Sequence, residues 1–544
     1  MYDPISEAVD QLIAPVKAYT GFSSDITKSF VSFTFTFIFA FIWPHLKAGA
    51  QRHFSSLVSG VFMLLFSYGT YSTLAFLGLV IPSYIIIACG FGQRHPLVVF
   101  AFNMVYLLTT FGYYYKTAYG VWQMDITGPL MIAVQKCTSL AWNLFDGHRQ
   151  SESIKKNGGV PPEKPVLRTS HQRRVAINEC PSFFKFISWI FFPISISYGP
   201  SAEYSMYISS VERTTSPLKS RYKLFFEQLI LGIICMVYFV KPTDTSFIYD
   251  EKFIQKPLIK KILIIHISME WTRLKYYAAW SLTNAAMILA GAGFDGHSWE
   301  GAINCFIFRL ETARRPRVFI ADWNCGTQRF LKYYIYVRGP TDKKTGQLHP
   351  FMQYTTFIVS AVWHGWYLAY SLHFSILFLI NVIDRLYFSM FPIKNEKRPL
   401  LYGIKETEKE LKELEAKKKE KDADAATPSP LLPSSSPSPM YSPSMTSAPS
   451  LATPAQTSTA TEAKNEKTGL FDVLRGIFDW MWTGLLFNYA ASTFAVLIWP
   501  DVLQINRVVD WWGLKVIAVV IPVLMVMKTI KGKKQRKEKN SKEL

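Results

Sequence analysis

The chain has 544 residues, of which 49% are hydrophobic and 15% aromatic, and its formal net charge at pH 7 is +20. The apolar residues gather in long blocks, which excludes an ordinary soluble enzyme and indicates a polytopic membrane protein. Lysine and arginine lie between and after these blocks, where positive flanks on membrane spans explain them better than a nucleic-acid partner would.

The first part of the chain is predicted to enter the membrane several times. Residues 1–28 indicate an interfacial helix followed by a turn at GFSSD, and their acidic, proline-broken start does not resemble a cleavable signal peptide. Apolar runs close to the ~20 residues that a bilayer requires follow at 30–43, 54–68, 71–89 and 97–115. Aromatic residues at the ends of these runs suit the membrane interface.

Residues 125–147 have a helical period but carry polar side chains such as Gln135, Lys136 and Asn143. We interpret them as a helix packed inside the bundle, with its polar groups bonded to neighbours.

Residues 148–180 are predicted to form a polar loop. The short apolar segment 183–196 indicates a re-entrant or interfacial helix. It leads to Glu203, a candidate for holding a polar headgroup, with a solvated carboxylate as an equal alternative.

Spans are predicted again at about 224–240 and 258–267, before a helix that begins WTRLKYYAAW. Lys275, Tyr276 and Tyr277 open this helix together with Arg273, and cations and phenols at a membrane boundary can hold phosphate. Snorkelling of these side chains to the interface explains the pattern equally well.

Two polar side chains stand out in the region that follows: Asn324 in DWNCGT and His364 in SAVWHGWY. His364 lies in an apolar run, 354–380, that is a membrane-span candidate, and an imidazole at membrane depth usually faces a cavity or a partner. Histidine can also move a proton near neutral pH. The alternative is a structural histidine bonded to a backbone carbonyl.

A dense basic cluster between residues 314 and 338, which includes Arg329 and Lys332, lies beside Asn324. It is suited to attract an anionic nucleotide carrier or phospholipid headgroups, and the positive-inside rule also accounts for it.

Six scattered cysteines form no Cys-x-x-Cys pair, so we expect neither a disulfide framework nor a metal site. Cys325 has no evident base to activate it as a nucleophile.

The charge pattern divides the chain into a transmembrane core over 1–393, a loop over 394–468, two further spans within 469–530 that complete the core, and a basic cytosolic tail over 531–544. The loop is first charged and then rich in Pro, Ser and Thr, so we expect it to be disordered and cytosolic. The whole fold is predicted to be an all-α transmembrane bundle of about 11 helices, at one helix per ~20 apolar residues.

WHGWYLAYSLHF resembles the signature of the membrane-bound O-acyltransferase (MBOAT) superfamily, although the Gly-Tyr of that signature is Ala369-Tyr370 here. DWNCGTQRFLKYYIYVR resembles the second signature of its lysophospholipid acyltransferase branch, of the broad-specificity fungal type. Stretches at 125–147, 198–204 and 273–280 also resemble that branch. The resemblance implies that His364 and Asn324 are catalytic and line a tunnel through the bundle. It implies that their motif neighbours bind substrate: Trp323, Trp363, Gly365 and Tyr370.

Acyl transfer needs a base, stabilisation of the oxyanion and alignment of two substrates. With an acyl-CoA thioester as co-substrate, no cofactor or metal is required. The resemblance therefore implies acyl-CoA-dependent acylation of a lysophospholipid, which belongs to phospholipid remodelling in the endoplasmic reticulum membrane. The terminal SKEL is a weak sign of that compartment. The alternatives are a sterol, diacylglycerol or protein acceptor, or a transporter. A homodimer is compatible with the sequence.

Overall fold

The computed structural model describes residues 3–543 except 91–94, 122, 164, 215–217, 240–244, 296–297, 343–346 and 394–469. In this part of the chain the regular structure is helical, and the pairing of Thr341 with Leu348 is an isolated bridge rather than a strand. The prediction of an all-α bundle is therefore confirmed. The loop predicted at 394–468 lies outside the described residues.

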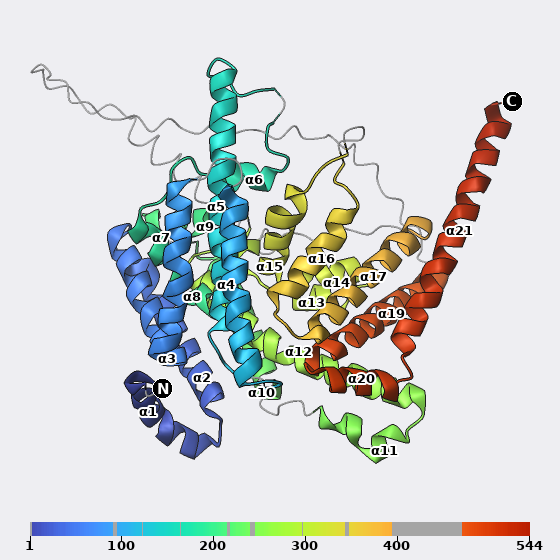
Figure 1. Cartoon of the computed structure of the whole chain (residues 1–544), viewed down its shortest axis with the longest axis horizontal. Helices are drawn as coiled ribbons and strands as arrows, with labels where there is room; N and C mark the ends of the chain where they lie inside the picture. The colour runs from blue at the N-terminus through green and yellow to red at the C-terminus, as the bar shows by residue number, and fades with distance from the viewer. Residues whose placement is uncertain are drawn as a thin grey trace, which may run out of the picture.

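The N-terminal part is a group of long helices, seen in blue to teal in Figure 1: α1 (Pro4–Thr20), α2 (Ser24–Ile42), α3 (Ala50–Cys89), α4 (His95–Thr117) and α5 (Thr127–Lys156). Helix α3 is broken at Gly69, where φ is 80° and ψ is −177°. Asp3 binds the start of its second half, accepting a bond of 2.7 Å from the Thr70 backbone N–H and one of 2.9 Å from the Thr70 hydroxyl. The two spans predicted at 54–68 and 71–89 are thus the two halves of α3.

Short helices connect the two halves of the molecule: α6 (Ser170–Val175), α7 (Phe183–Ile190), α8 (Pro193–Ile196) and α9 (Tyr204–Glu212). The segment predicted as re-entrant or interfacial is α7 with α8. It packs against α3, and Phe186, Trp189 and Phe191 are fully buried. One face of this segment therefore completes a core, while Phe183 and Phe184 on α7 are exposed, and its re-entrant or interfacial position stays a prediction.

The second half contains more helices, coloured green to red in Figure 1. They are α10 (Arg221–Phe239), α11 (Glu251–Ile254), α12 (Leu258–Leu289), α13 (Ile307–Glu311), α14 (Pro316–Asp322), α15 (Cys325–Phe330), the π-helical turn η5 (Leu331–Ile335), η6 (Tyr336–Arg338), α16 (Phe351–Trp363), α17 (Leu368–Met390), α19 (Leu470–Ala495), α20 (Trp499–Val508) and α21 (Trp512–Glu543). Helix α21 projects from the bundle and carries the predicted basic tail as a continuous helix.

Two predictions about helix boundaries are corrected. The span ending near residue 267 and the helix after it are one continuous helix, α12, because no helix-breaking residue separates them. The apolar run 354–380 is two helices rather than one span, since α16 ends at Trp363 and α17 begins at Leu368. Gly365 lies in the turn between them with φ of 111°, a value that ends a right-handed helix.

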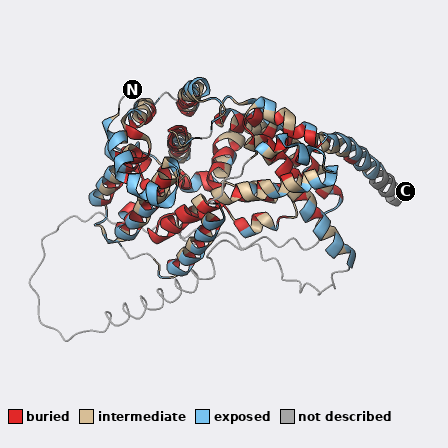
Figure 2. Cartoon of the chain, turned by 90° about the horizontal axis from the view of Figure 1, so that it is seen from below, coloured by how far each residue is buried: buried red, intermediate tan, exposed pale blue. Residues whose placement is uncertain are grey.

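Five of the described helical segments are long and apolar enough to cross a membrane, and they lie in α2 with the following turn, α3, α4, α17 and α21: Ser24–His45, Ala50–Cys89, His95–Thr117, Leu368–Met390 and Trp512–Lys533. Helices α5 and α12 are also long, but buried polar side chains interrupt them. The two largest clusters of buried hydrophobic residues lie around α2 to α8 and around α12, α17 and α19. Figure 2 shows the buried residues gathered in the middle of the molecule and the exposed ones on the outside and along α21.

Candidate active site

A cavity of about 360 Å³ lies between α12, α15, the α16–α17 turn and α19, and we call it the reaction cavity. Asn324 and His364, forty residues apart in the sequence, both line it. Its wall is mainly apolar, with polar side chains at a few places. That combination is typical of sites that hold an organic substrate in a set orientation.

Asn324 stands between α14 and α15 with φ of 46° and ψ of 58°, a left-handed conformation that asparagine tolerates better than most residues. The backbone on its C-terminal side is fixed by Asn304. The Asn304 carbonyl accepts from Cys325 N–H at 2.7 Å, and its side-chain oxygen accepts from Gly326 N–H at 2.9 Å. Asn304 is itself held by Asn284, whose side-chain oxygen accepts its N–H at 3.0 Å. The Asn324 carboxamide makes no hydrogen bond to a described residue.

His364 follows the last residue of α16, and its imidazole is surrounded by aromatic rings. The ring centroids of Phe374, Phe494 and Tyr370 lie 5.1, 5.3 and 5.5 Å from it. No described residue forms a hydrogen bond with its ring nitrogens. The alternative of a structural histidine instead describes His373, whose Nδ1 donates to the Ala490 carbonyl at 2.8 Å. His373 also lines the reaction cavity, and the sequence pattern did not mark it.

A second, larger cavity of about 1070 Å³ opens beside the first and is lined by many charged residues; we call it the vestibule. Arg329 and Lys332, from the predicted basic cluster, line it. Neither forms an ion pair with a described residue, whereas Arg309 is bound by Asp322 at 2.6 Å. Helix α15 and η5 stand between the two cavities, and Gln328 lines both of them.

Helix α5 braces this dividing wall, which explains its buried polar side chains. Gln135 Nε2 donates to Thr327 Oγ1 at 3.0 Å, which fixes α15. At the other end, Asp146 binds Arg338 through two parallel bonds of 2.7 and 2.8 Å. The polar groups of α5 are thus bonded to neighbouring elements, as predicted for residues 125–147, and they hold the wall in place.

Glu203 lines the vestibule, but its carboxylate is committed to internal partners. It accepts from the Tyr334 hydroxyl at 2.9 Å and from Asn143 Nδ2 at 3.4 Å, and His171 Nε2 lies 3.4 Å away. Burial alone would raise the pKa of Glu203, yet these hydrogen bonds and the His171 charge outweigh burial and lower it. Its side chain is only 11% exposed, so a solvated carboxylate is wrong, and its oxygens are occupied rather than free for a headgroup.

The polar residues of α12 that were predicted to hold phosphate, within WTRLKYYAAW, fall into two groups in the structure. Lys275 and Tyr276 line the reaction cavity, as does Trp323, which packs on Tyr276 with centroids 5.5 Å apart. Tyr277 is buried and does not line it, so the predicted contact of Tyr277 with substrate is not supported.

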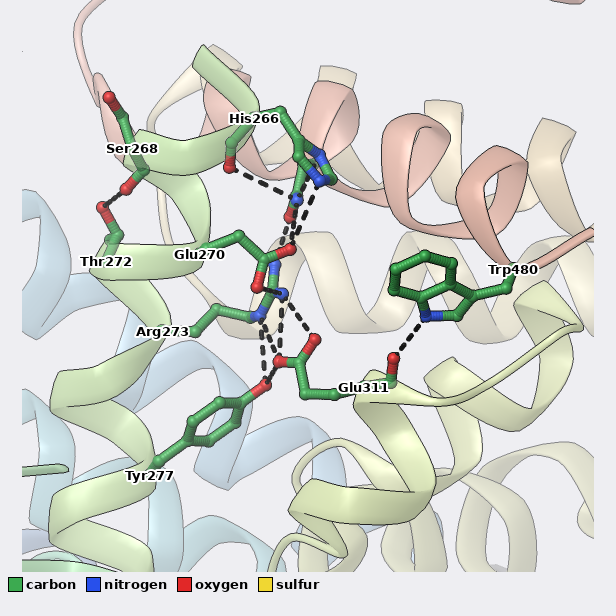
Figure 3. A network of polar contacts seen from close by, with 9 residues as sticks. His266, Ser268, Glu270, Thr272, Arg273, Tyr277, Glu311 and Trp480 are labelled. Carbon is green, nitrogen blue, oxygen red and sulfur yellow. Dashed lines mark hydrogen bonds and ion pairs between the residues drawn. The ribbon is translucent and has the colours of Figure 1, made fainter. Parts of the chain in front are cut away.

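Figure 3 shows the reason, because Tyr277 and Arg273 belong to a network with acidic residues. Arg273 binds Glu311 at 2.9 Å and Glu270 at 2.6 Å, and the Tyr277 hydroxyl donates to Glu311. Two carboxylates compensate the guanidinium, so Arg273 lines the cavity as a neutralised group rather than as an open phosphate site. Its predicted role in holding phosphate is corrected accordingly.

The remaining motif residues, Trp363, Gly365 and Tyr370, surround His364 or form the turn next to it. Trp363 is buried, and its indole N–H donates to the Met131 carbonyl at 3.3 Å. Tyr370 is buried with its ring 5.5 Å from the imidazole, and Gly365 forms the turn. None of the three lines the reaction cavity, and Trp363 and Tyr370 instead pack on the imidazole; their contact with substrate stays a prediction. Burial raises the pKa of the Cys325 thiol to about 12, which disfavours the thiolate that a nucleophile requires.

The comparison with known proteins places the chain in a family. The model of "MBOAT, membrane-bound O-acyltransferase family" matches residues 16–403. The human protein named membrane-bound glycerophospholipid O-acyltransferase 1 is 25% identical over 382 residues, which are 64% of this chain and 72% of that protein. The Schizosaccharomyces pombe lysophospholipid acyltransferase is 26% identical over 380 residues, 66% of this chain and 71% of its own. The Saccharomyces cerevisiae lysophospholipid acyltransferase is 28% identical over 295 residues, 48% of this chain and 46% of its own. Because the family model spans most of the sequence, the chain belongs to the membrane-bound O-acyltransferase family.

Proposed function

We propose that the protein is an acyl-CoA-dependent lysophospholipid O-acyltransferase that acylates the free glycerol hydroxyl of a lysophospholipid. Family membership supports O-acyl transfer, and the names of the relatives favour a glycerophospholipid acceptor. The observation that carries the proposal is the placement of Asn324 and His364 on one cavity, each with a polar side chain that no described residue binds.

In the proposed reaction, an imidazole nitrogen of His364 takes the proton of the acceptor hydroxyl, and the hydroxyl oxygen attacks the thioester carbonyl. Asn324 donates a hydrogen bond to the oxyanion that forms. The carbon–sulfur bond then breaks, the carbonyl re-forms, and the imidazolium returns the proton to the leaving coenzyme A thiolate. Because the thioester is already activated, the transfer is direct and requires neither a covalent enzyme intermediate nor a metal.

The donor would place its nucleotide in the vestibule. Arg329 and Lys332 line that cavity without an acidic partner among the described residues, so they are suited to attract its phosphates. The acyl chain would occupy the apolar part of the reaction cavity, and the acceptor would reach the same cavity from the bilayer. We further propose that the basic C-terminal end of α21 is cytosolic and that the membrane is that of the endoplasmic reticulum.

Labelled acyl-CoA and separate acceptors, added to membranes that contain the protein, test the proposal. We expect transfer to lysophospholipids rather than to a sterol, diacylglycerol or protein. We expect His364→Ala to abolish it and Asn324→Ala to lower turnover at least ~100-fold, the scale of a lost oxyanion donor. A loss confined to KM would indicate a binding role for Asn324 instead.

His349→Ala and Asn157→Ala are matched controls, since both side chains are exposed and line neither cavity. Full activity of His364→Ala would refute the catalytic assignment. Transport of a solute without any acyl transfer would refute the proposed function itself.

A further inference from the structure

Gln328 occupies a position that no other described residue shares, because it lines both the reaction cavity and the vestibule. Its backbone N–H donates to the Asn324 carbonyl at 2.9 Å, so it lies one helical turn after Asn324 on α15. Asn324 is the N-cap of α15 in a left-handed conformation, and its side chain and that of Gln328 both line the reaction cavity. Gln328 is therefore next to Asn324 on the side where the two cavities meet.

The Gln328 carboxamide is not used by the fold. It makes no hydrogen bond to a described residue and is partly exposed. By contrast, the neighbouring Thr327 hydroxyl already accepts from Gln135 at 3.0 Å, and Arg329 uses one of its N–H donors on the Glu300 carbonyl at 3.2 Å. A carboxamide offers both a donor and an acceptor, so Gln328 can bind a ligand group that also has both.

The ligand group follows from the proposed function, on which this inference rests. A donor with its nucleotide in the vestibule and its thioester beside Asn324 must pass its pantetheine arm across the α15 wall. The amide of that arm nearest the sulfur is separated from it by two methylene groups, which places it about one helical turn from the reacting carbonyl. An amide that leaves water without gaining a hydrogen-bond partner is unfavourable, so this amide requires a partner on the wall.

We propose that Gln328 hydrogen-bonds the pantetheine amide nearest the sulfur and thereby sets the thioester carbonyl beside Asn324. Gln328 is then a donor-binding residue. Its bond to the amide fixes the position of the thioester relative to the nucleotide. It selects donors that carry an amide at this position and is indifferent to the acceptor.

A cycle of one enzyme change and one donor change tests this inference. The enzyme change is Gln328→Leu, which keeps much of the side-chain volume and removes both polar groups. The donor change replaces that amide of acyl-CoA by a hydrocarbon link of the same length. In the wild type, we expect the replacement to lower kcat/KM about tenfold, which corresponds to about 1.4 kcal/mol. In Gln328→Leu, we expect kcat/KM for acyl-CoA to be lower by a similar factor and the replacement to have no further effect.

Gln353→Leu is the control, because Gln353 on α16 is also partly exposed but lines neither cavity, and it should behave as the wild type. The inference is overturned if the replacement costs the same in Gln328→Leu as in the wild type, or if Gln328→Leu leaves kcat/KM for acyl-CoA unchanged. A wild-type protein that transfers acyl groups to lysophospholipid from another donor but never from acyl-CoA would overturn the proposed donor, and the role of Gln328 with it.

Discussion

The turn at Gly365 determines where the His364 imidazole lies, and Gly365→Ala tests this directly. At φ of 111° an alanine is strained, by about 1–3 kcal/mol for a residue held in a sparsely populated region. Its Cβ would also lie 3.1 Å from the Phe111 ring, which must then move. The chain can relieve this strain only by shifting the turn between α16 and α17. Because a displacement of about 1 Å in a catalytic group can cost ~100-fold in rate, we expect kcat to fall at least about tenfold.

The assay is acyl transfer to lysophospholipid by purified protein in detergent, with thermal stability measured on the same samples. Gly532→Ala on α21 is the matched control, since its Cβ would meet nothing within 4 Å and its φ is not positive. An alanine there favours the helix slightly and should leave kcat unchanged. If Gly365→Ala kept both wild-type kcat and wild-type stability, the strained turn would not be what positions His364.

Two further predictions concern the wall between the cavities. Asp146→Asn should destabilise the protein by about 3–5 kcal/mol, since it leaves the Arg338 guanidinium buried without its carboxylate, with the two side chains 0% and 8% exposed. The double variant Asp146→Leu with Arg338→Met should lose less in a detergent unfolding assay, and an equal loss would argue against the ion pair. The pKa of Glu203 is lowered in the fold, so its contribution to stability is present above its ordinary value of 4.5 and is lost as the pH falls through its lowered pKa. Glu203→Gln should flatten this acid dependence of the thermal midpoint, and an unchanged pH profile would contradict the assignment.

The sequence by itself determined the class of the molecule and its two central side chains. Apolar blocks of membrane-spanning length and positive flanks require a polytopic helical protein, because a bilayer leaves few other structures possible. The sequence alone also identified Asn324 and His364, because burying a polar group among aromatic residues in a membrane protein is costly and usually marks a functional site. Even the break in α3 at Gly69 followed from the local pattern.

Which polar groups face the cavities was decided only by the tertiary structure. Arg273 looked like a phosphate ligand until the fold brought Glu311, 38 residues away, onto its guanidinium. Arg338 forms an ion pair with Asp146, 192 residues away in the sequence. The Gln328 side chain, in contrast, has no hydrogen-bond partner among the described residues. The spacing of residues along the sequence predicts which face of a helix is buried. The hydrogen-bond or ion-pair partner of a polar side chain, however, depends on which element packs against that face. That neighbour comes from a distant part of the chain, so availability for substrate is a property of the packed bundle and not of the motif.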